Sequence, residues 1–171
     1  MSTAVPIVRQ RDEGELMWFA GGGAMRWKAT GAETGGAFLL LDDHMEQGKV
    51  TPMHVHPNED EAIYVIDGEL LVDVEGERHR VGAGGFFFAP RGVPHAFMVV
   101  SARGAHVISW QTPASGEPFY RQAGETVQTE EEAARPADWA RLRAVAERSP
   151  SIEIVGPAPF ADVELEQTAP A

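Results

Sequence analysis

Short runs of hydrophobic residues, several of them alternating with polar ones, fill the central part of the chain between Ala37 and Trp110. Each run has the length of a strand, and glycine, proline, asparagine or aspartate separates one run from the next. The pair Asp67-Gly68 is typical of a tight hairpin turn, because such a turn needs residues with positive φ. Eight short strands at this spacing predict a mainly all-β fold, an antiparallel β-sandwich or barrel. The strands expected are residues 37–41, 49–56, 61–67, 69–75, 77–81, 85–90, 95–100 and 105–110.

The two ends of the chain depart from this pattern. Residues 1–36 are mixed, with two short strands expected on either side of Gly21–Gly23. After about residue 120 the apolar spacing becomes helical, and one amphipathic helix is expected to begin near Trp139 and to end before Pro150. We therefore expect three parts: an N-terminal β arm (1–36), a barrel (37–120) and a short C-terminal helical extension with a tail (121–171).

Composition and charge narrow the possible functions. The chain has 171 residues, of which 43% are hydrophobic, and this suits a single folded domain with its own core. A formal net charge of −12 disfavours binding to nucleic acid or to anionic membranes. The absence of cysteine excludes disulfides and thiolate metal sites. No membrane-spanning run and no signal peptide are recognised, so a soluble cytoplasmic protein is expected.

Three histidines and one glutamate form the pattern with the clearest chemistry. His54 and His56 are two residues apart, so in a strand both imidazoles point to the same face. A four-residue turn then leads to Glu61, which an antiparallel return brings back beside them, and His95 begins a further strand. Three imidazoles and one carboxylate suit one divalent transition metal ion: Fe, Ni, Mn, Co, Cu or Zn. Without a thiolate, a closed structural zinc site is disfavoured, and the ion would keep open positions.

These residues resemble the two signature motifs of the cupin superfamily. The first motif runs from Gly48 to Gly68 and includes the two histidines and the glutamate at the family spacing. The second runs from Gly84 to His95, and its final asparagine is replaced here by Val99. The resemblance implies a jelly-roll β-barrel that carries one metal ion, with His54, His56, Glu61 and His95 as ligands.

More specifically, the chain resembles small bacterial cupins of the quercetin 2,3-dioxygenase type. That resemblance implies a dioxygenase that uses O2 on a small aromatic or enolisable substrate, with Glu61 also serving as the catalytic base. It also implies a homodimer, because cupins commonly pair through sheet faces and N-terminal strands. Two other functions remain open: a non-redox metal-dependent isomerase, cyclase or lyase, and a small-molecule-binding cupin without turnover.

Strand periodicity also suggests which residues surround the metal. Ile63 and Val65 share the face of Glu61, and Phe97 shares the face of His95, so these three are expected to line a substrate pocket. Glu59 is a second, less favoured ligand candidate. The remaining histidines receive structural interpretations: His44 in a loop, His79 facing solvent and His106 half-buried on a strand. Two places are open to the N-terminal aromatic residues Trp18, Phe19 and Trp27, the mouth of the barrel or a dimer interface, and the interface is favoured.

Overall fold

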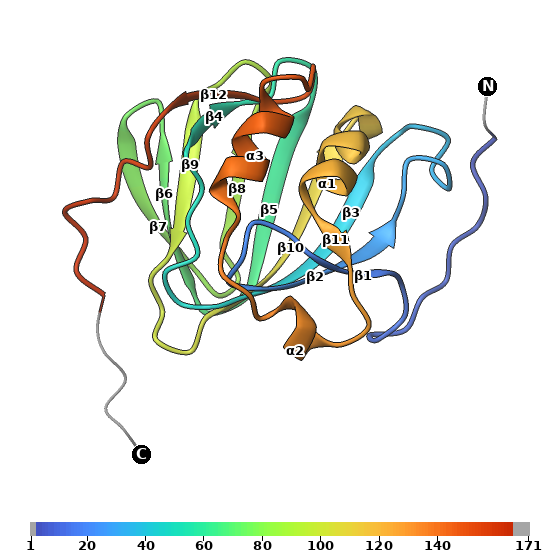
Figure 1. Cartoon of the computed structure of the whole chain (residues 1–171), viewed down its shortest axis with the longest axis horizontal. Helices are drawn as coiled ribbons and strands as arrows, with labels where there is room; N and C mark the ends of the chain where they lie inside the picture. The colour runs from blue at the N-terminus through green and yellow to red at the C-terminus, as the bar shows by residue number, and fades with distance from the viewer. Residues whose placement is uncertain (1–2, 166–171) are drawn as a thin grey trace.

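Two antiparallel sheets face each other and form a β-sandwich (Figure 1). The computed structural model describes residues 3–165, so residues 1–2 and the last six residues of the expected tail lie outside the described part. The larger sheet contains, in spatial order, β11 (Glu125–Thr126), β1 (Leu16–Trp18), β2 (Gly23–Ala29), β3 (Leu39–Met45), β10 (Ala105–Thr112), β5 (Asp60–Asp67) and β8 (Phe86–Ala89). The smaller sheet contains β12 (Glu153–Gly156), β4 (Met53–Val55), β9 (His95–Val99), β6 (Glu69–Val74) and β7 (Glu77–Gly82). The predicted all-β fold is confirmed.

A sharp bend at Asp67-Gly68 joins β5 to β6. The predicted hairpin at this place is wrong, because β5 pairs with β10 and β8 in the larger sheet and β6 pairs with β7 and β9 in the smaller one. Gly68 has a φ of 83°, a conformation that side-chain-bearing residues rarely adopt. A Cβ atom at this position would lie 2.3 Å from the carbonyl oxygen of Gly104, so only glycine fits where the chain crosses from one sheet to the other.

The core between the sheets consists of aliphatic and aromatic side chains from both inner faces, and along each strand these alternate with residues that face outward. Residues such as Val65, Leu70, Val72 and Val99 are at most 1% exposed. Val99, which replaces the usual asparagine of the second motif, belongs to this core. The alternation seen in the sequence therefore corresponds to inward and outward faces of the strands.

Short helices cover the part of the larger sheet that the smaller sheet leaves uncovered. Helices α1 (Glu117–Ala123) and α3 (Trp139–Ala146) lie beside each other over β1, β2 and β3 (Figure 1). Helix α3 begins as predicted, where the Asp138 side chain accepts a hydrogen bond from the backbone N–H of Arg141 at 2.9 Å. The 3₁₀ turn Ala114–Gly116 and α2 (Glu130–Ala133) complete the helical part.

Helix α1 was not predicted. It has seven residues, too few to show a helical period in the sequence. Its start does carry two signals, Glu117 in the first turn and Pro118 directly after it. The helix is important because it places Tyr120 over the inner face of the sheet.

The N-terminal aromatic residues are buried within the chain rather than available for a dimer interface. Trp27 on β2 is 1% exposed and packs edge-on against Tyr120, with ring centroids 6.0 Å apart. Trp18 on β1 is 4% exposed and contacts the guanidinium of Arg135. The expected interface role is therefore wrong for Trp18 and Trp27, because β1 and β2 extend the larger sheet and α1 and α2 cover them. Phe19 is half-buried and lines the internal cavity, as the alternative position over the barrel mouth predicts.

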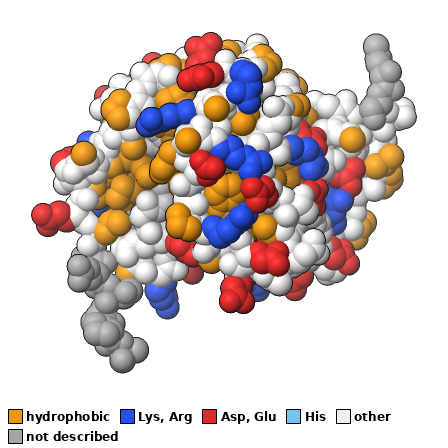
Figure 2. Space-filling view, viewed as in Figure 1, with side chains coloured by type: hydrophobic (Ala, Val, Ile, Leu, Met, Phe, Trp, Pro, Cys, Tyr) orange, Lys and Arg blue, Asp and Glu red, His pale blue; other side chains and the backbone are white. Residues whose placement is uncertain are grey.

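The surface mixes both signs of charge. Figure 2 shows acidic and basic side chains interspersed over the face that carries α1 and α3. Among residues 3–165, no helix has the length and apolar character needed to cross a bilayer.

Candidate metal centre

Four side chains from three strands and one turn meet inside the sandwich. His54 lies on β4, His56 directly follows that strand, Glu61 lies on β5 and His95 begins β9. The expected antiparallel return from the histidines to Glu61 is wrong, because β4 and β5 belong to different sheets, and Glu61 meets the histidines across the sandwich. His54 and His95 are direct partners in the antiparallel pairing of β4 and β9. All four residues are buried, with at most 6% exposed, and one ligand atom from each lies within 4.8 Å of the others.

Backbone carbonyls orient all three imidazoles. The Nδ1 atom of His54 donates to Pro52 O at 2.9 Å, that of His56 to Ser151 O at 2.8 Å, and that of His95 to Val93 O at 3.0 Å. Each Nδ1 therefore carries a proton, and Nε2 is the nitrogen that faces the other side chains of the site. His95 Nε2 lies 2.9 Å from Glu61 Oε2, and His56 Nε2 lies 3.3 Å from the amide nitrogen of Gln111. Hydrogen bonds of this kind are the usual way in which proteins hold metal-binding histidines in place.

The charges of the cluster favour an ionised glutamate next to a cation. Burial alone would raise the pKa of Glu61, but the nearby His56 and His95 outweigh it and lower that pKa. Burial lowers the pKa of His54 to about 3. Burial also disfavours protonated His95, but the hydrogen bond between its Nε2 and Glu61 Oε2, at 2.9 Å, raises its pKa overall. A proton thus lies between His95 and Glu61, and a metal ion could take its place.

The spacing of the ligand atoms fits a transition metal ion. With bonds of about 2.1 Å, neighbouring ligands in octahedral coordination are about 3.0 Å apart and opposite ligands about 4.2 Å apart. His95 Nε2 lies 2.9 Å and His56 Nε2 lies 3.8 Å from Glu61 Oε2. Small side-chain rotations bring such a set onto one ion, and the donor types suit the borderline divalent metals. Glu59 is fully buried and accepts a hydrogen bond from Ser115, outside this cluster.

Two further residues of the site were missed in the sequence. Gln111, on β10 directly opposite Glu61, donates from Nε2 to Glu61 Oε1 at 3.1 Å and to the Tyr120 hydroxyl at 3.0 Å. Burial raises the pKa of Tyr120 well above its usual value, so its hydroxyl stays protonated. Gln111 lies one residue beyond the predicted end of its strand, and Tyr120 lies on the unpredicted α1.

An apolar cavity leads to the cluster. Its wall includes His54, His56 and Glu61, and its volume is about 80 Å³, room for about six water molecules. Of the three residues expected to line a substrate pocket, Ile63 and Phe97 lie in this wall. Val65, by contrast, is 0% exposed and packs in the core, because it is one strand repeat further from the cluster than Ile63.

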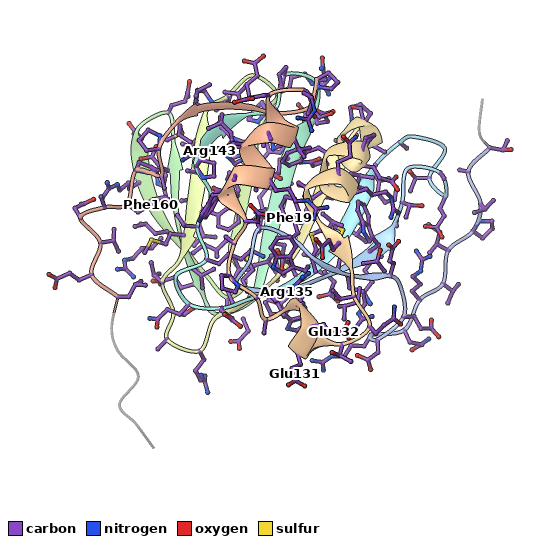
Figure 3. All side chains as sticks on the ribbon, in the orientation of Figure 1. Phe19, Glu131, Glu132, Arg135, Arg143 and Phe160 are labelled. Atoms are coloured by element: carbon purple, nitrogen blue, oxygen red, sulfur yellow. The ribbon has the colours of Figure 1, made fainter. Side chains whose placement is uncertain are left out.

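Aromatic residues and one ion pair complete the cavity wall. Phe19 packs against Phe119 and Tyr120 and lies between α1 and α3 (Figure 3), so it covers the cavity. Trp139, which is 37% exposed, also lines it. The buried pair of Lys49 and Asp43, 3.3 Å apart, provides charged groups in this otherwise mostly apolar wall.

Comparison with known proteins identifies the family. Residues 42–110, which contain all four clustered side chains, match the family model described as "Cupin domain". These residues form a cupin domain. The predicted resemblance to cupins is thereby confirmed, and the buried cluster of this cupin domain is a candidate metal site.

Individual relatives of the cupin domain include an enzyme. A quercetin 2,3-dioxygenase of Bacillus subtilis (strain 168) is 32% identical over 99 residues, which are 58% of this chain and 29% of that protein. The chain thus spans less than a third of this curated relative. An RmlC-like cupin from Shewanella frigidimarina matches with a TM-score of 0.58 and 23% identity, over 70% of this chain and 99% of that one. An oxalate decarboxylase from Bacillus subtilis matches with a TM-score of 0.51 and 20% identity, over 65% and 33% of the two chains. These two structures show the shared fold.

Proposed function

We propose that this cupin domain holds one divalent transition metal ion through His54, His56, Glu61 and His95 and acts as a dioxygenase on a small aromatic or enolisable substrate. The observation that carries the proposal is an apolar cavity whose wall includes three of the four candidate ligands. The similarity to a quercetin 2,3-dioxygenase supports the choice of reaction. When bound, the ion supplies Lewis acidity and, if it is redox-active, electron exchange with O2.

The residues of the chain bind the substrate, exclude water and move one proton. The apolar side chains Ile63 and Phe97 would contact the carbon skeleton, and Phe19 would limit the entry of water. Glu61 is the proposed base for a substrate hydroxyl, because it is ionised and lies at the edge of the cavity. Gln111 donates to Glu61 Oε1 and so leaves Oε2 as the oxygen available for the metal or the proton.

The size of the cavity limits the substrate. A volume of about 80 Å³ suits a compact enol or β-diketone better than a flavonol of three rings. A flavonol would need the entrance to widen, through rotation of Phe19 and of the partly exposed Trp139. We therefore expect compact substrates to be turned over in preference to flavonols.

A non-redox lyase, isomerase or cyclase is the second candidate function. The observation that favours it is the buried pair Asp43 and Lys49, which places an acid and a base in the same cavity as the candidate metal ligands. Such chemistry needs only a Lewis-acid metal such as zinc. A binding protein without turnover would use the same cavity.

Oxygen consumption tests the proposal. The protein is stripped with a chelator, reloaded separately with Fe, Ni, Mn, Co, Cu or Zn, and assayed in an oxygen electrode with β-diketones and flavonols. Uptake of O2 that requires a redox-active metal and is lost in His95→Ala supports a dioxygenase. Turnover without O2 supports the second candidate, and the absence of any turnover with a fully loaded site would contradict both.

We also propose that the chain forms a homodimer through the outer face of the larger sheet. Tyr64, Ile66, Phe86 and Phe88 on β5 and β8 are 42–54% exposed, and Phe86 stacks on Trp110 of β10 at a centroid distance of 5.8 Å. A contiguous apolar face of this kind is rare on a monomer.

Light scattering tests the dimer. The wild type should have twice the chain mass of 18.5 kDa, and Phe86→Lys should shift the mass toward the monomer. Val155→Lys is the matched control, since Val155 is equally exposed on β12, outside this face. A wild-type mass near 18.5 kDa would refute the proposal.

A further inference from the structure

A second group of metal-binding side chains lies on the outer face of the larger sheet. Asp42 and His44 are two residues apart on β3, and His106 on β10 is the direct cross-strand partner of His44. These side chains point away from the cavity, whereas the intervening Asp43 lines it. His44 is therefore a strand residue and not the loop residue that was expected.

Both imidazoles face one carboxylate oxygen. His106 Nε2 lies 2.7 Å and His44 Nε2 lies 3.6 Å from Asp42 Oδ1. The two imidazoles are stacked, with centroids 3.9 Å and planes 16° apart, so one ring has to rotate before both Nε2 atoms can point at a single ion. One ligand atom from each residue lies within 4.8 Å of the others. In tetrahedral coordination with bonds of about 2.1 Å, ligand atoms are about 3.4 Å apart. The distance from His106 to Asp42 is shorter than this value, and the distance from His44 to Asp42 is slightly longer.

The surroundings leave room for an ion. The residue beside His44 on β2 is Ala24, which has a small side chain. Two surface hollows meet here, and both are lined by His44 and by Glu130 at the start of α2. Glu130 thus offers a carboxylate on the opposite side of the hollow from the sheet.

Lys28, the nearest cationic side chain, does not take the place of a metal ion here. Lys28 Nζ lies 3.7 Å from Asp42 Oδ2, the oxygen that faces away from the histidines. Its ammonium group instead donates to the carbonyl oxygens of Gln10, Arg11 and Glu13. Asp42 Oδ1 and the two imidazoles therefore remain as a ligand set.

We propose that Asp42, His44 and His106 form a second binding site for a divalent transition metal ion, distinct from the buried cluster. Two imidazoles and one carboxylate favour Zn²⁺, Cu²⁺ or Ni²⁺ over Mg²⁺ or Ca²⁺. Water completes the coordination, because the side chain of His44 is 43% exposed. The site binds more weakly than the buried one, since it has three protein ligands instead of four.

The test is a titration of the full-length, chelator-stripped protein with Zn²⁺ alone, followed by calorimetry. The wild type should bind two ions per chain in two steps of different affinity. His44→Gln and His106→Gln should each lose the weaker step and keep the tighter one. His79→Gln is the matched control, because His79 is an exposed histidine elsewhere on the sandwich, and it should keep both steps.

The variant His95→Ala separates this proposal from the proposed function. It should weaken the tighter step, which belongs to the buried cluster, and leave the weaker step unchanged. Binding of one ion per chain by the wild type, or two steps that survive in both His44→Gln and His106→Gln, would overturn the second site.

Discussion

Replacement of Gln111 by methionine should weaken metal binding at the buried cluster without removing a ligand. The amide Nε2 of Gln111 donates to Glu61 Oε1 at 3.1 Å, and both residues are buried, at 1% and 6% exposed. Methionine has a similar volume but no donor, so Glu61 would lose the group that holds its carboxylate. The ligand would then have to be ordered by the metal itself.

The expected magnitude follows from this hydrogen bond. A buried bond to a charged acceptor contributes about 1.5–3 kcal/mol, which corresponds to an affinity loss of about 10- to 150-fold at 1.4 kcal/mol per decade. Tyr120 also loses a partner in Gln111→Met, because its hydroxyl lies 3.0 Å from the same Nε2. That loss should lower the free energy of unfolding of the apoprotein by about 1–3 kcal/mol.

The assay is competition with a chromophoric chelator, carried out in the His44→Gln background so that the outer cluster does not contribute. Gln122→Met, an exposed position on α1, is the matched control. If Gln111→Met folds and binds the metal with wild-type affinity, the amide has no part in holding Glu61, and the reasoning is refuted.

Two other results are expected. Glu61→Gln should keep part of the metal but lose about 10²- to 10⁴-fold in turnover per bound metal. His95→Ala, by contrast, should lose metal and activity in proportion. Normal turnover per bound metal in Glu61→Gln would show that Glu61 is a ligand only. A hydrogen bond from Arg9 lowers the pKa of Glu33 to about 2, so the charged pair stabilises the fold above about pH 4.5 and this contribution is lost as the pH falls toward 2. Denaturant unfolding should show Arg9→Met less stable by about 1 kcal/mol at pH 7, with the difference shrinking below pH 4.5; a difference independent of pH would contradict the assignment.

The sequence predicts the strands well where turns bound them on both sides. Residues 69–75 were expected as a strand and β6 spans Glu69–Val74, because Gly68 and Gly76 mark its two ends. The prediction fails where polar residues continue a strand. The run 37–41 ends at Leu41 in the hydrophobic pattern, but β3 extends to Met45. Residues 42–44 are polar because the strand borders a cavity on one face and solvent on the other.

The candidate metal cluster could be predicted for a local reason. Strand spacing puts His54 and His56 close together, and the short turn that leads from them to Glu61 in the facing sheet keeps all three near one another. Gln111 could not be found in this way, because its contact with Glu61 depends on the pairing of β10 with β5 across 50 residues. Tyr120 depends in addition on a helix too short to have a visible period.

Strand β10 contributes to both candidate metal sites, one on each face of the sheet. On the outer face its pairing with β3 brings His106 beside His44, and on the inner face its pairing with β5 places Gln111 opposite Glu61. Because side chains alternate between faces, a shift of β10 by one residue would turn His106 inward and Gln111 outward and disturb both sites together. A side-chain substitution leaves the register intact and should remove one site only. Independent loss of the two binding steps therefore follows from the strand geometry, and joint loss would point to a damaged sheet instead of a missing ligand.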